Sequence, residues 1–414
     1  MRIAVIGSGI SGLAAAYYLS RKHEVFLFER EARLGGHTHT VTVDSSRGPL
    51  AVDTGFIVHN GRTYPNLVKL FEELGVETQP SDMSFAVSSR STGFEYSSRG
   101  LNGFFAQRTN ALRPAHYRLL REILRFNREA PKLLDDRAVE ALTLGDVIDQ
   151  GGYSPELAER YLYPMACAVW SMSNDAIRSF PAHTLIRFFD NHGMLGIDTH
   201  PKWRTIRGGS NSYLAPITAP YRDRICADVA IEEVIRHSAG VTLRFQSRSD
   251  MAFDQVVFAC HGNQILPMLE SPSDAERQIL GCFTTSRNEV CLHSDSSLLP
   301  RRPQARASWN YHLNPASSGA TLTYHMNRLQ SLDVPEDYCV TMNDSGSIDP
   351  AKVLRRLVYY HPIYNRQTVE AQERWNEISG ANRTHFCGAY WYYGFHEDGL
   401  NSALRVARAL GVEV

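Results

Sequence analysis

The chain has 414 residues, of which 43% are hydrophobic and 21% are charged, and its formal net charge is −1. This length allows two or three domains with a large core. The near-zero charge argues against nucleic-acid binding through a basic surface, and the sequence has no run of 18 apolar residues that would predict a membrane-spanning helix.

The first residues predict a strand, a glycine-rich turn and a helix. Residues 2–6 are largely apolar and lead into the pattern G-x-G-x-x-G at Gly7, Gly9 and Gly12, and residues 13–20 are rich in alanine. The first glycine permits a tight turn, the second lets the backbone approach a pyrophosphate at the helix N-terminus, and the third lets helix and strand pack closely. We therefore expect a nucleotide-binding βαβ unit. Its predicted phosphate-binding loop also includes Ser8, Ile10 and Ser11.

An acidic residue follows the second predicted strand. Residues 24–28 form this strand, and Glu29 stands at its end, where a carboxylate can accept hydrogen bonds from a ribose diol. Two adjacent glycines follow, which allow the chain to turn back along the pyrophosphate. The candidate cofactor contacts in this segment are Glu29, Arg30, Arg33, Gly35, Gly36 and His37.

Residues 29–37 resemble the E-x-x-x-R-x-G-G-R motif of the FAD-dependent amine oxidase and phytoene desaturase superfamily, and the resemblance implies FAD as the cofactor. His37 stands where the motif has its final arginine. An imidazole can donate a hydrogen bond to a phosphate, but it lacks the fixed charge and forked geometry of a guanidinium. Residues 52–56 resemble the D-x-G element that passes near the flavin, which adds Thr54, Gly55 and Phe56 to the candidate cofactor contacts.

A second match lies near the end of the sequence. Residues 386–390 resemble the closing strand of the superfamily, and residues 394–403 resemble its G-x-x-x-G-A element, followed here by a helix predicted over residues 400–410. The resemblance implies that the N-terminus of this helix points at the N1–C2=O edge of the flavin, where it would stabilise the negative charge that develops on reduction. The implied contacts are Gly388, Ala389, Gly399 and Leu400.

Central segments extend the resemblance over essentially the whole chain. Residues 227–234 resemble the strand whose backbone contacts the adenine, here near Val229, and residues 253–260 resemble the strand that returns to the nucleotide sheet. The implied fold class is α/β: a GR2-type Rossmann FAD-binding domain with an interleaved α+β substrate domain of a mixed sheet plus helices. We assign residues 1–75, 204–270 and 378–414 to the FAD-binding domain, and residues 76–203 and 271–377 to the substrate domain.

Periodicity and turn signals predict the elements of the substrate domain in chain order. Helices are expected at residues 103–135, 142–150 and 155–168, and strands at residues 283–293, 306–312, 321–326 and 338–342. A sheet with helices on one side fits this order.

The catalytic candidates flank the C-terminal motif, because the flavin performs the redox step and the protein orients the substrate. They are Trp391, Tyr393 and His396, and Lys202 is the one lysine expected near the site. In the amine oxidases, an aromatic residue at about the place of His396 helps to form a cage that faces the flavin. We hypothesise proton transfer by His396, because histidine titrates near neutral pH. Hydrogen bonding to the flavin or to a backbone group is the alternative.

One difference from the amine oxidase sequences counts against an amine oxidase function. Many amine oxidases carry a lysine on a strand of the substrate domain, bridged by water to flavin N5. The comparable residues 287–293 contain no lysine.

The substrate domain is rich in aromatic and thioether side chains, most of which we expect in the core. They are Tyr161, Tyr163, Met165, Trp170, Met172, Phe188, Phe189, Met194, Trp309, Tyr311, Tyr324 and Met326. A subset that lined a cavity would suit a long apolar substrate.

The resemblance is to a bacterial group of amine-oxidase-like proteins described as NAD/FAD-binding, and it suggests chemistry on modified fatty-acyl lipids. The leading hypothesis is an FAD-dependent oxidoreductase that oxidises or desaturates an apolar acyl or isoprenoid substrate by hydride transfer to flavin N5. Three alternatives stay open: an amine or amino-acid oxidase, a flavin-dependent double-bond isomerase, and a non-enzymatic flavin-binding partner protein.

The seven cysteines are scattered and include no C-x-x-C pair, and the sixteen histidines include no H-E-x-x-H. We therefore expect neither a metal site nor a disulfide framework, and we expect a cytoplasmic protein. The expected partner is a small-molecule or lipid substrate and not a nucleic acid, and peripheral contact at the inner face of the membrane is a further expectation.

Overall fold

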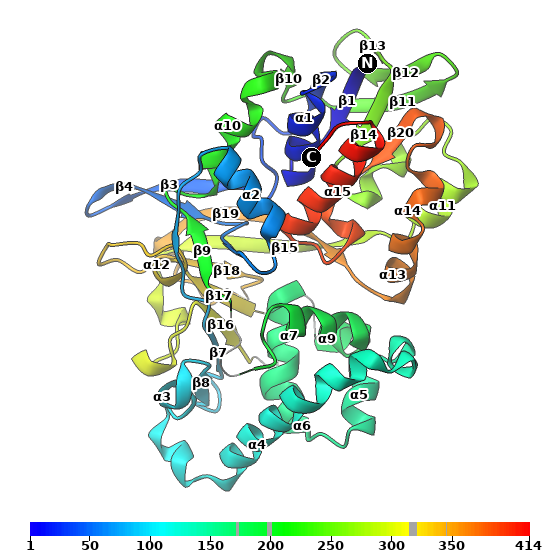
Figure 1. The fold of residues 1–414 in the computed structure, drawn as a ribbon. Helices are drawn as coiled ribbons and strands as arrows, with labels where there is room; N and C mark the ends of the chain where they lie inside the picture. The colour runs from blue at the N-terminus through cyan, green and yellow to red at the C-terminus, as the bar shows by residue number, and fades with distance from the viewer. Residues whose placement is uncertain (171–173, 197–200, 314–320, 345) are drawn as a thin grey trace.

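A parallel sheet built from both ends of the chain forms one half of the molecule, in a computed structural model that describes residues 1–170, 174–196, 201–313, 321–344 and 346–414 (Figure 1). Its strand order is β10-β2-β1-β14-β20. The strands are β1 (Arg2–Ile6), β2 (Glu24–Phe28), β10 (Ile225–Cys226), β14 (Gln255–Phe258) and β20 (Thr384–Phe386). Apolar runs such as residues 3–6 suit a sheet that is covered on both faces.

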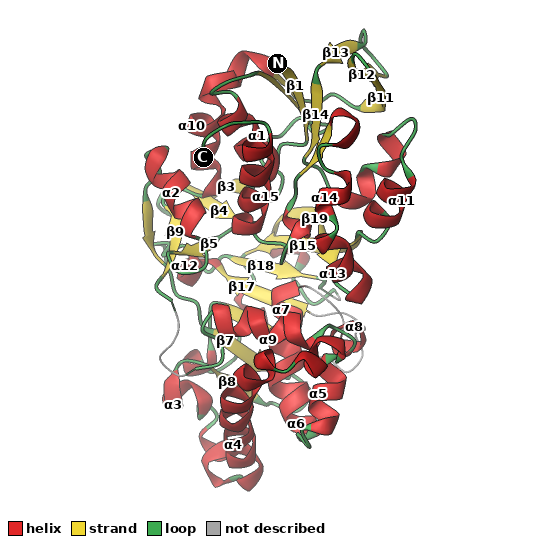
Figure 2. Ribbon diagram, turned by 45° about the vertical axis from the view of Figure 1, so that its right-hand side comes forward, coloured by secondary structure: helices red, strands yellow, loops and turns green. Residues whose placement is uncertain are grey.

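Two helices from opposite ends of the sequence lie side by side against this sheet, as Figure 2 shows. They are α1 (Ile10–Leu19) and α15 (His396–Ala409). Gly399 allows the close approach of the two helices, because a Cβ there would lie 2.7 Å from Ile10 Cγ2. Gly12 allows α1 to pack closely on the end of β1, because a Cβ there would lie 1.8 Å from the carbonyl oxygen of Gly7. The third glycine of the motif therefore serves packing, as the sequence predicted.

A seven-stranded mixed sheet forms the second half, with the order β19-β15-β18-β17-β16-β7-β8. Its strands are β7 (Phe85–Ser88), β8 (Glu95–Ser97), β15 (Thr284–His293), β16 (Trp309–His312), β17 (Thr321–His325), β18 (Cys339–Met342) and β19 (Val353–Ile363). The helices of this half gather beyond one face of the sheet, at the end of the molecule away from the termini (Figure 1). They are α3 (Gly100–Phe104), α4 (Pro114–Glu129), α5 (Leu144–Gln150), α6 (Pro155–Leu157), α7 (Tyr163–Trp170), α8 (Asn174–Arg178) and α9 (Ala182–Asn191).

Smaller elements connect the two halves. A hairpin of β3 (Thr40–Ser45) and β4 (Gly48–Asp53), the sheet β5-β9-β6, the sheet β11-β12-β13 and several short helices complete the fold. Their bounds are β5 (Val58–Asn60), β6 (Thr78–Pro80), β9 (Trp203–Ile206), β11 (Ile231–His237), β12 (Gly240–Phe245), β13 (Met251–Phe253), α2 (Pro65–Glu73), α10 (Leu214–Thr218), α11 (Asp274–Leu280), α12 (Met326–Leu329), α13 (Arg366–Glu373) and α14 (Trp375–Ile378). Among the described residues, no helix combines the length and apolar character needed to cross a bilayer. The α/β fold class predicted from the sequence is confirmed.

The packing of α11 and α14 differs from the predicted domain boundaries. Both helices fall in residues assigned to the substrate domain, yet Ile279 and Trp375 belong to the core of the parallel sheet. The indole Nε1 of Trp375 also donates a hydrogen bond of 2.8 Å to the carbonyl oxygen of Phe386 in β20. These helices cover the edge of the sheet that β20 would otherwise expose.

The helix predicted over residues 103–135 is divided. Residues 108–112 form a 3₁₀ turn, and α4 begins at Pro114, because proline lacks an N–H and its fixed φ suits the first position of a helix. Met172, one of the apolar side chains named above, lies outside the described residues.

We expect Gly12→Ala to lower the free energy of unfolding by about 3 kcal/mol, because the clash is with a backbone atom that no rotamer change relieves. Gly61→Ala is the matched control, since a Cβ at Gly61 would have no atom within 4 Å, and it should change stability by less than about 0.5 kcal/mol. Urea denaturation measures both variants. Equal stability of the two would contradict the close packing of α1 on β1.

Candidate functional site

One large cavity runs from the glycine-rich loop into the helical end of the second half. Its volume is about 1880 Å³, well above the roughly 300–1,000 Å³ of a pocket for one small ligand. Most of the residues predicted from the sequence line it: Gly7, Ser8, Gly9, Ile10, Ser11, Glu29, Arg30, Arg33, Gly36, His37, Thr54, Gly55, Phe56, Val229, Gly388, Ala389, Tyr393 and His396. The cavity therefore has room for a dinucleotide and a second ligand.

The glycine-rich loop has the geometry of a pyrophosphate site. Gly7 adopts a φ of 105°, which favours glycine. A Cβ added at Gly9 would have no protein atom within 4 Å, so the space in front of the loop is open. The first N–H groups of α1 lack partners within the helix, and together with the helix dipole they favour a bound anion. An FAD pyrophosphate fits this loop.

The carboxylate of Glu29 lies beside the same loop. Its Oε2 accepts hydrogen bonds from the Ser8 N–H at 2.9 Å and the Ser8 hydroxyl at 2.6 Å, and its Oε1 accepts one from the Glu31 N–H at 2.9 Å. These contacts hold the carboxylate at the carboxyl end of β2, where a ribose diol would meet it. The backbone N–H of Val229 donates to the carbonyl oxygen of Glu29 at 3.0 Å, which brings the predicted adenine-contacting segment to this end of the cavity.

Arg33, a predicted cofactor contact, lines the cavity and also holds the loop that follows it. Its guanidinium donates to the carbonyl oxygens of Leu34, Gly36 and Thr38 at 3.1, 2.7 and 2.9 Å. With its donors on the backbone, Arg33 fixes the path of the loop that carries Gly35 and Gly36. It therefore positions the cofactor loop.

Six predicted site residues do not line the cavity. They are Gly12, Gly35, Gly399, Leu400, Trp391 and Lys202. The glycines among them permit close packing of the backbone: Gly35, for example, donates its N–H to the carbonyl oxygen of Ser8 at 3.1 Å. Leu400 is fully buried in the core of the parallel sheet.

Neither Trp391 nor Lys202, both catalytic candidates from the sequence, lines the cavity. The Trp391 ring is buried against Phe283 and Tyr390, at 4.8 and 5.3 Å between centroids, so it is part of the core. Lys202 is exposed, and its side chain lies outside the cavity wall.

His396 lies in the cavity wall as a neutral, hydrogen-bonded ring. It stacks on Phe56 at 3.7 Å between centroids, and its Nε2 lies 3.1 Å from the Thr38 hydroxyl. Burial, with a smaller contribution from His59, lowers the pKa of His396 to about 3. A base this weak is poorly suited to take up a proton near neutral pH. The geometry therefore favours the alternative role, in which His396 orders the cavity wall by stacking and hydrogen bonding.

The C-terminal helix α15 begins at His396, four residues earlier than predicted. The carboxylate of Asp398 accepts a hydrogen bond of 2.9 Å from the Phe395 N–H and so caps α15 at His396. The neighbouring Glu397 is buried and accepts from the N–H groups of Asn66 and Leu67 at 3.0 and 2.8 Å, which caps the N-terminus of α2. Two helix N-termini therefore meet at this part of the wall, each with its own carboxylate.

A group of aromatic and imidazole rings surrounds His37. Its ring lies 5.0 Å from the ring of Tyr359, 5.2 Å from that of His361 and 6.2 Å from that of His261. Desolvation, together with these neighbouring histidines, lowers the pKa of His37 well below its usual value. The ring is therefore neutral, and it lacks the charge of the arginine that it replaces. No sequence motif marks His261, Tyr359 and His361, so they were not predicted as site residues.

The far end of the cavity is apolar. Its walls come from α3, α4, α7, α9 and the central strands of the seven-stranded sheet. The side chains are Leu101, Phe104, Leu120, Ile123, Leu124, Tyr161, Met165, Val169, Trp170, Phe188, Met194, Trp309, Tyr324 and Met342. Seven of the aromatic and thioether residues named from the sequence are in this set: Tyr161, Met165, Trp170, Phe188, Met194, Trp309 and Tyr324.

Comparison with known proteins identifies the relatives of this chain. Residues 10–339 match the family of flavin containing amine oxidoreductases. The protein AofH of Mycobacterium tuberculosis, which carries the assignment of a flavin-containing monoamine oxidase, is 25% identical over 248 residues. The match covers 58% of this chain and 53% of AofH, so the matched region spans about half the length of that relative.

Solved structures share the whole fold at low sequence identity. Putrescine oxidase bound to putrescine has a TM-score of 0.72 and 14% identity, and the match covers 99% of both chains. A CLA-producing fatty acid isomerase from P. acnes has a TM-score of 0.70 and 15% identity, also over 99% of both chains. These likenesses establish the fold, and the family match makes FAD the cofactor, which confirms the prediction from the sequence.

We expect Glu29→Gln to weaken FAD binding by roughly tenfold to a hundredfold, because a hydrogen bond to a charged acceptor contributes about 1.5–3 kcal/mol. Glu24→Gln, at the other end of the same strand and exposed, is the matched control. Fluorescence titration of apoprotein with FAD measures the two dissociation constants. A Glu29→Gln protein with the affinity of the control would overturn the assignment of Glu29 to the ribose.

The low pKa of His396 predicts a pH dependence of stability. The folded-state pKa lies below the unfolded value near 6.5, so the unfolded chain binds more protons and stability falls as the pH falls from 6.5 towards 3. In His396→Phe, the loss of stability between pH 7 and pH 5.5 should be smaller by about 1 kcal/mol. Urea denaturation at both pH values gives the difference, and the exposed His237→Phe serves as control. An unchanged pH dependence in His396→Phe would refute the neutral state of His396.

Proposed function

The chain belongs to the flavin-containing amine oxidoreductase family, and we propose that this FAD-dependent oxidoreductase acts on a long acyl chain that lies in the apolar end of the cavity. The main support for this proposal is the apolar, uncharged character of the cavity wall. FAD supplies hydride acceptance when bound, and the protein has to hold and orient the bond that is oxidised.

The apolar end matches an acyl chain in chemical character. It runs from Phe188 and Phe395, whose rings stack at 5.0 Å between centroids, to Leu120 and Leu124 on α4. An acyl chain gains about 0.8 kcal/mol for each CH₂ removed from water in such a site. A small polar substrate would leave most of this wall in contact with water.

The cavity has no counter-charge for a protonated amine near the predicted flavin edge. Among the described residues that line it, only Glu29 and Glu31 carry carboxylates, and both lie at the ribose end. Burying an unpaired ammonium group is costly, so a site for such a substrate needs a nearby acidic partner. The cavity therefore favours an uncharged, apolar substrate over a charged amine.

Aromatic rings gather around Phe188 in the cavity wall. Tyr393 lies 5.9 Å from Phe188 between ring centroids, and His192 stacks on Phe188 at 3.8 Å. Burial lowers the pKa of His192 to about 4, so this ring is also neutral. We assign these rings the task of excluding water and holding the chain against the flavin edge next to His396.

Double-bond isomerisation without net oxidation is the second candidate. The same apolar cavity would hold an unsaturated acyl chain, and the fatty acid isomerase from P. acnes has this fold. The two reactions differ in whether electrons remain on the flavin when no acceptor is present.

We expect liposomes of mixed unsaturated and branched acyl lipids to bleach the visible flavin absorption of the holoenzyme under anaerobic conditions, and a panel of amines to leave it unchanged. Val169→Phe should slow bleaching by eighteen-carbon chains about tenfold or more, because the larger ring fills the apolar end of the cavity. FAD affinity, measured on the same variant, should be unchanged because Val169 lies in α7, outside the segments predicted to bind FAD.

The outcomes separate the candidates. Conversion of the lipid without bleaching would favour isomerisation, as detected by mass spectrometry and by double-bond position in the product. Bleaching by an amine alone would overturn the acyl-chain proposal.

A further inference from the structure

The helical end of the molecule carries an exposed apolar surface ringed by arginines, which we call the tip surface. Its apolar members are Leu101 on α3, Leu112 on the following 3₁₀ turn, and Tyr117 and Leu124 on α4. Leu101 is 70% exposed and Leu112 is 86% exposed. These four residues are half of the large hydrophobic side chains that are exposed among the described residues. Exposed apolar side chains gathered in this way mark an interaction site.

The charge of the tip surface is strongly positive. Residues 100–129 contain six arginines and two glutamates, of which Glu129 forms ion pairs with Arg125 and Arg128, whereas the whole chain has a net charge of −1. Arg108, Arg113, Arg118 and Arg121 are exposed, and none of them forms an ion pair within the described part of the chain. The other glutamate, Glu122, accepts a hydrogen bond from the hydroxyl of Ser154, the residue before α6.

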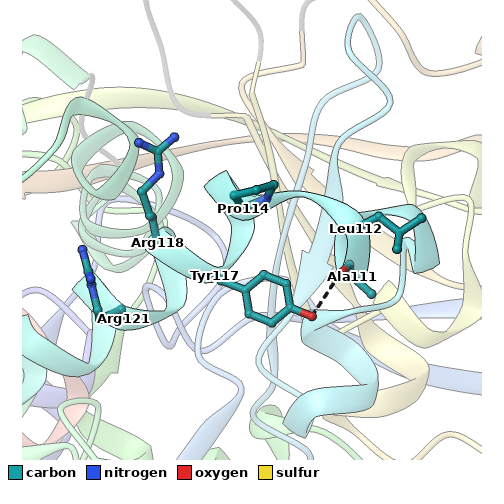
Figure 3. Close-up of a pocket in the computed structure, with 6 residues that line it drawn as sticks. All are labelled: Ala111, Leu112, Pro114, Tyr117, Arg118 and Arg121. Carbon is teal, nitrogen blue, oxygen red and sulfur yellow. Dashed lines mark hydrogen bonds between the residues drawn. The ribbon is translucent and has the colours of Figure 1, made fainter.

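Figure 3 shows the central part of the tip surface, where a shallow pocket lies between the 3₁₀ turn and the first turns of α4. The Tyr117 ring lies along the surface, and its hydroxyl donates a hydrogen bond of 3.0 Å to the carbonyl oxygen of Ala111 (Figure 3). Arg118 and Arg121 extend from the same helix (Figure 3). Leucine, tyrosine and arginine side chains on one helical face are the composition that binds at the boundary between lipid headgroups and acyl chains.

Two residues of the tip surface also line the cavity, which brings the cavity to the molecular surface at this end. Leu101 and Leu124 are exposed, and both line the cavity whose other end holds the FAD loop. Leu120 and Phe104 continue the wall inwards. In Figure 1 this region, around α3 and α4, is at the end of the molecule opposite the chain termini. A ligand that enters between α3 and α4 therefore passes through the tip surface before it reaches the flavin.

We propose that the tip surface docks the protein on an anionic lipid bilayer, with the end of the cavity at Leu101 and Leu124 facing the membrane. Leu112 and Tyr117 enter the headgroup boundary, and the arginines bind the lipid phosphates. An acyl chain can then pass from the bilayer into the cavity without crossing water. The docking surface goes beyond the proposed function, because binding to a bilayer requires no turnover.

The test uses the FAD-bound protein and vesicles of phosphatidylcholine, alone or with 30% phosphatidylglycerol, separated by flotation. The wild-type protein should float with the anionic vesicles and remain unbound with pure phosphatidylcholine, and 1 M salt should release it because screening shortens the Debye length to about 3 Å. Arg118→Gln combined with Arg121→Gln should weaken binding about 30-fold, at about fivefold for each arginine. Leu112→Ser should weaken it about tenfold.

Matched controls lie on other faces of the molecule. Arg222→Gln combined with Arg408→Gln removes two exposed arginines from the other half, and Leu354→Ser removes an exposed leucine from β19. Both controls should bind as the wild-type protein does. Flavin absorption and circular dichroism show that each variant is folded.

The proposal is overturned if the wild-type protein does not bind anionic vesicles, or if the tip variants bind as well as the controls. Binding with no lipid turnover would support the docking surface and count against the acyl-chain proposal. Lipid turnover with no vesicle binding would count against the docking surface and support the acyl-chain proposal.

Discussion

The close contact between the two ends of the chain is the constraint on which the cofactor site depends. α1 begins at the glycine-rich loop and α15 follows the closing motif, and Gly399 of α15 packs directly on the Ile10 and Ser11 side chains of α1. A Cβ at Gly12 would meet the backbone of Gly7, and a Cβ at Gly399 would meet Ile10 and Ser11. Because Gly399 lacks a side chain, α1 and α15 lie close enough for Ile10 and His396, nearly 400 positions apart in sequence, to line the same cavity.

Neutral histidines give this wall its chemical character. Desolvation lowers the pKa values of His37, His361 and His396, so the rings that line the middle of the cavity carry no charge at neutral pH. The carboxylates of Glu397 and Asp398 serve as helix caps and so satisfy backbone donors. The wall thus presents rings and hydrogen-bonding groups to the ligand rather than charges, and this neutrality continues into the apolar end. An acyl chain beside a flavin is consistent with both halves of the cavity.

The sequence predicted the nucleotide-binding half well because each element there has a local cause. Gly7 needs a positive φ, Gly12 needs to lack a Cβ, and Glu29 directly follows an apolar strand. The sequence was less informative where the position of a residue depends on distant parts of the chain. Trp391 neighbours the closing motif in sequence, but its ring faces Phe283 in the core. The start of α15 depends on a cap by Asp398 that spacing alone did not reveal.

The aromatic and imidazole rings around His37 show the same limit of prediction from the sequence. Tyr359 and His361 lie on β19, more than 300 positions from His37, and no motif connects them. The aromatic and thioether residues of the substrate domain were correctly named as a set, but composition could not tell which of them face a cavity and which pack in the core. That division depends on how α4 and α7 lie against the seven-stranded sheet. It becomes visible only in three dimensions.

A crystal structure of the holoenzyme with a bound saturated eighteen-carbon fatty acid tests the central claim, that one cavity holds FAD and an acyl chain end to end. The account predicts electron density for the isoalloxazine beside His396 and for the chain from Phe188 towards Leu124. Density for the flavin in this position with the chain bound elsewhere would contradict it.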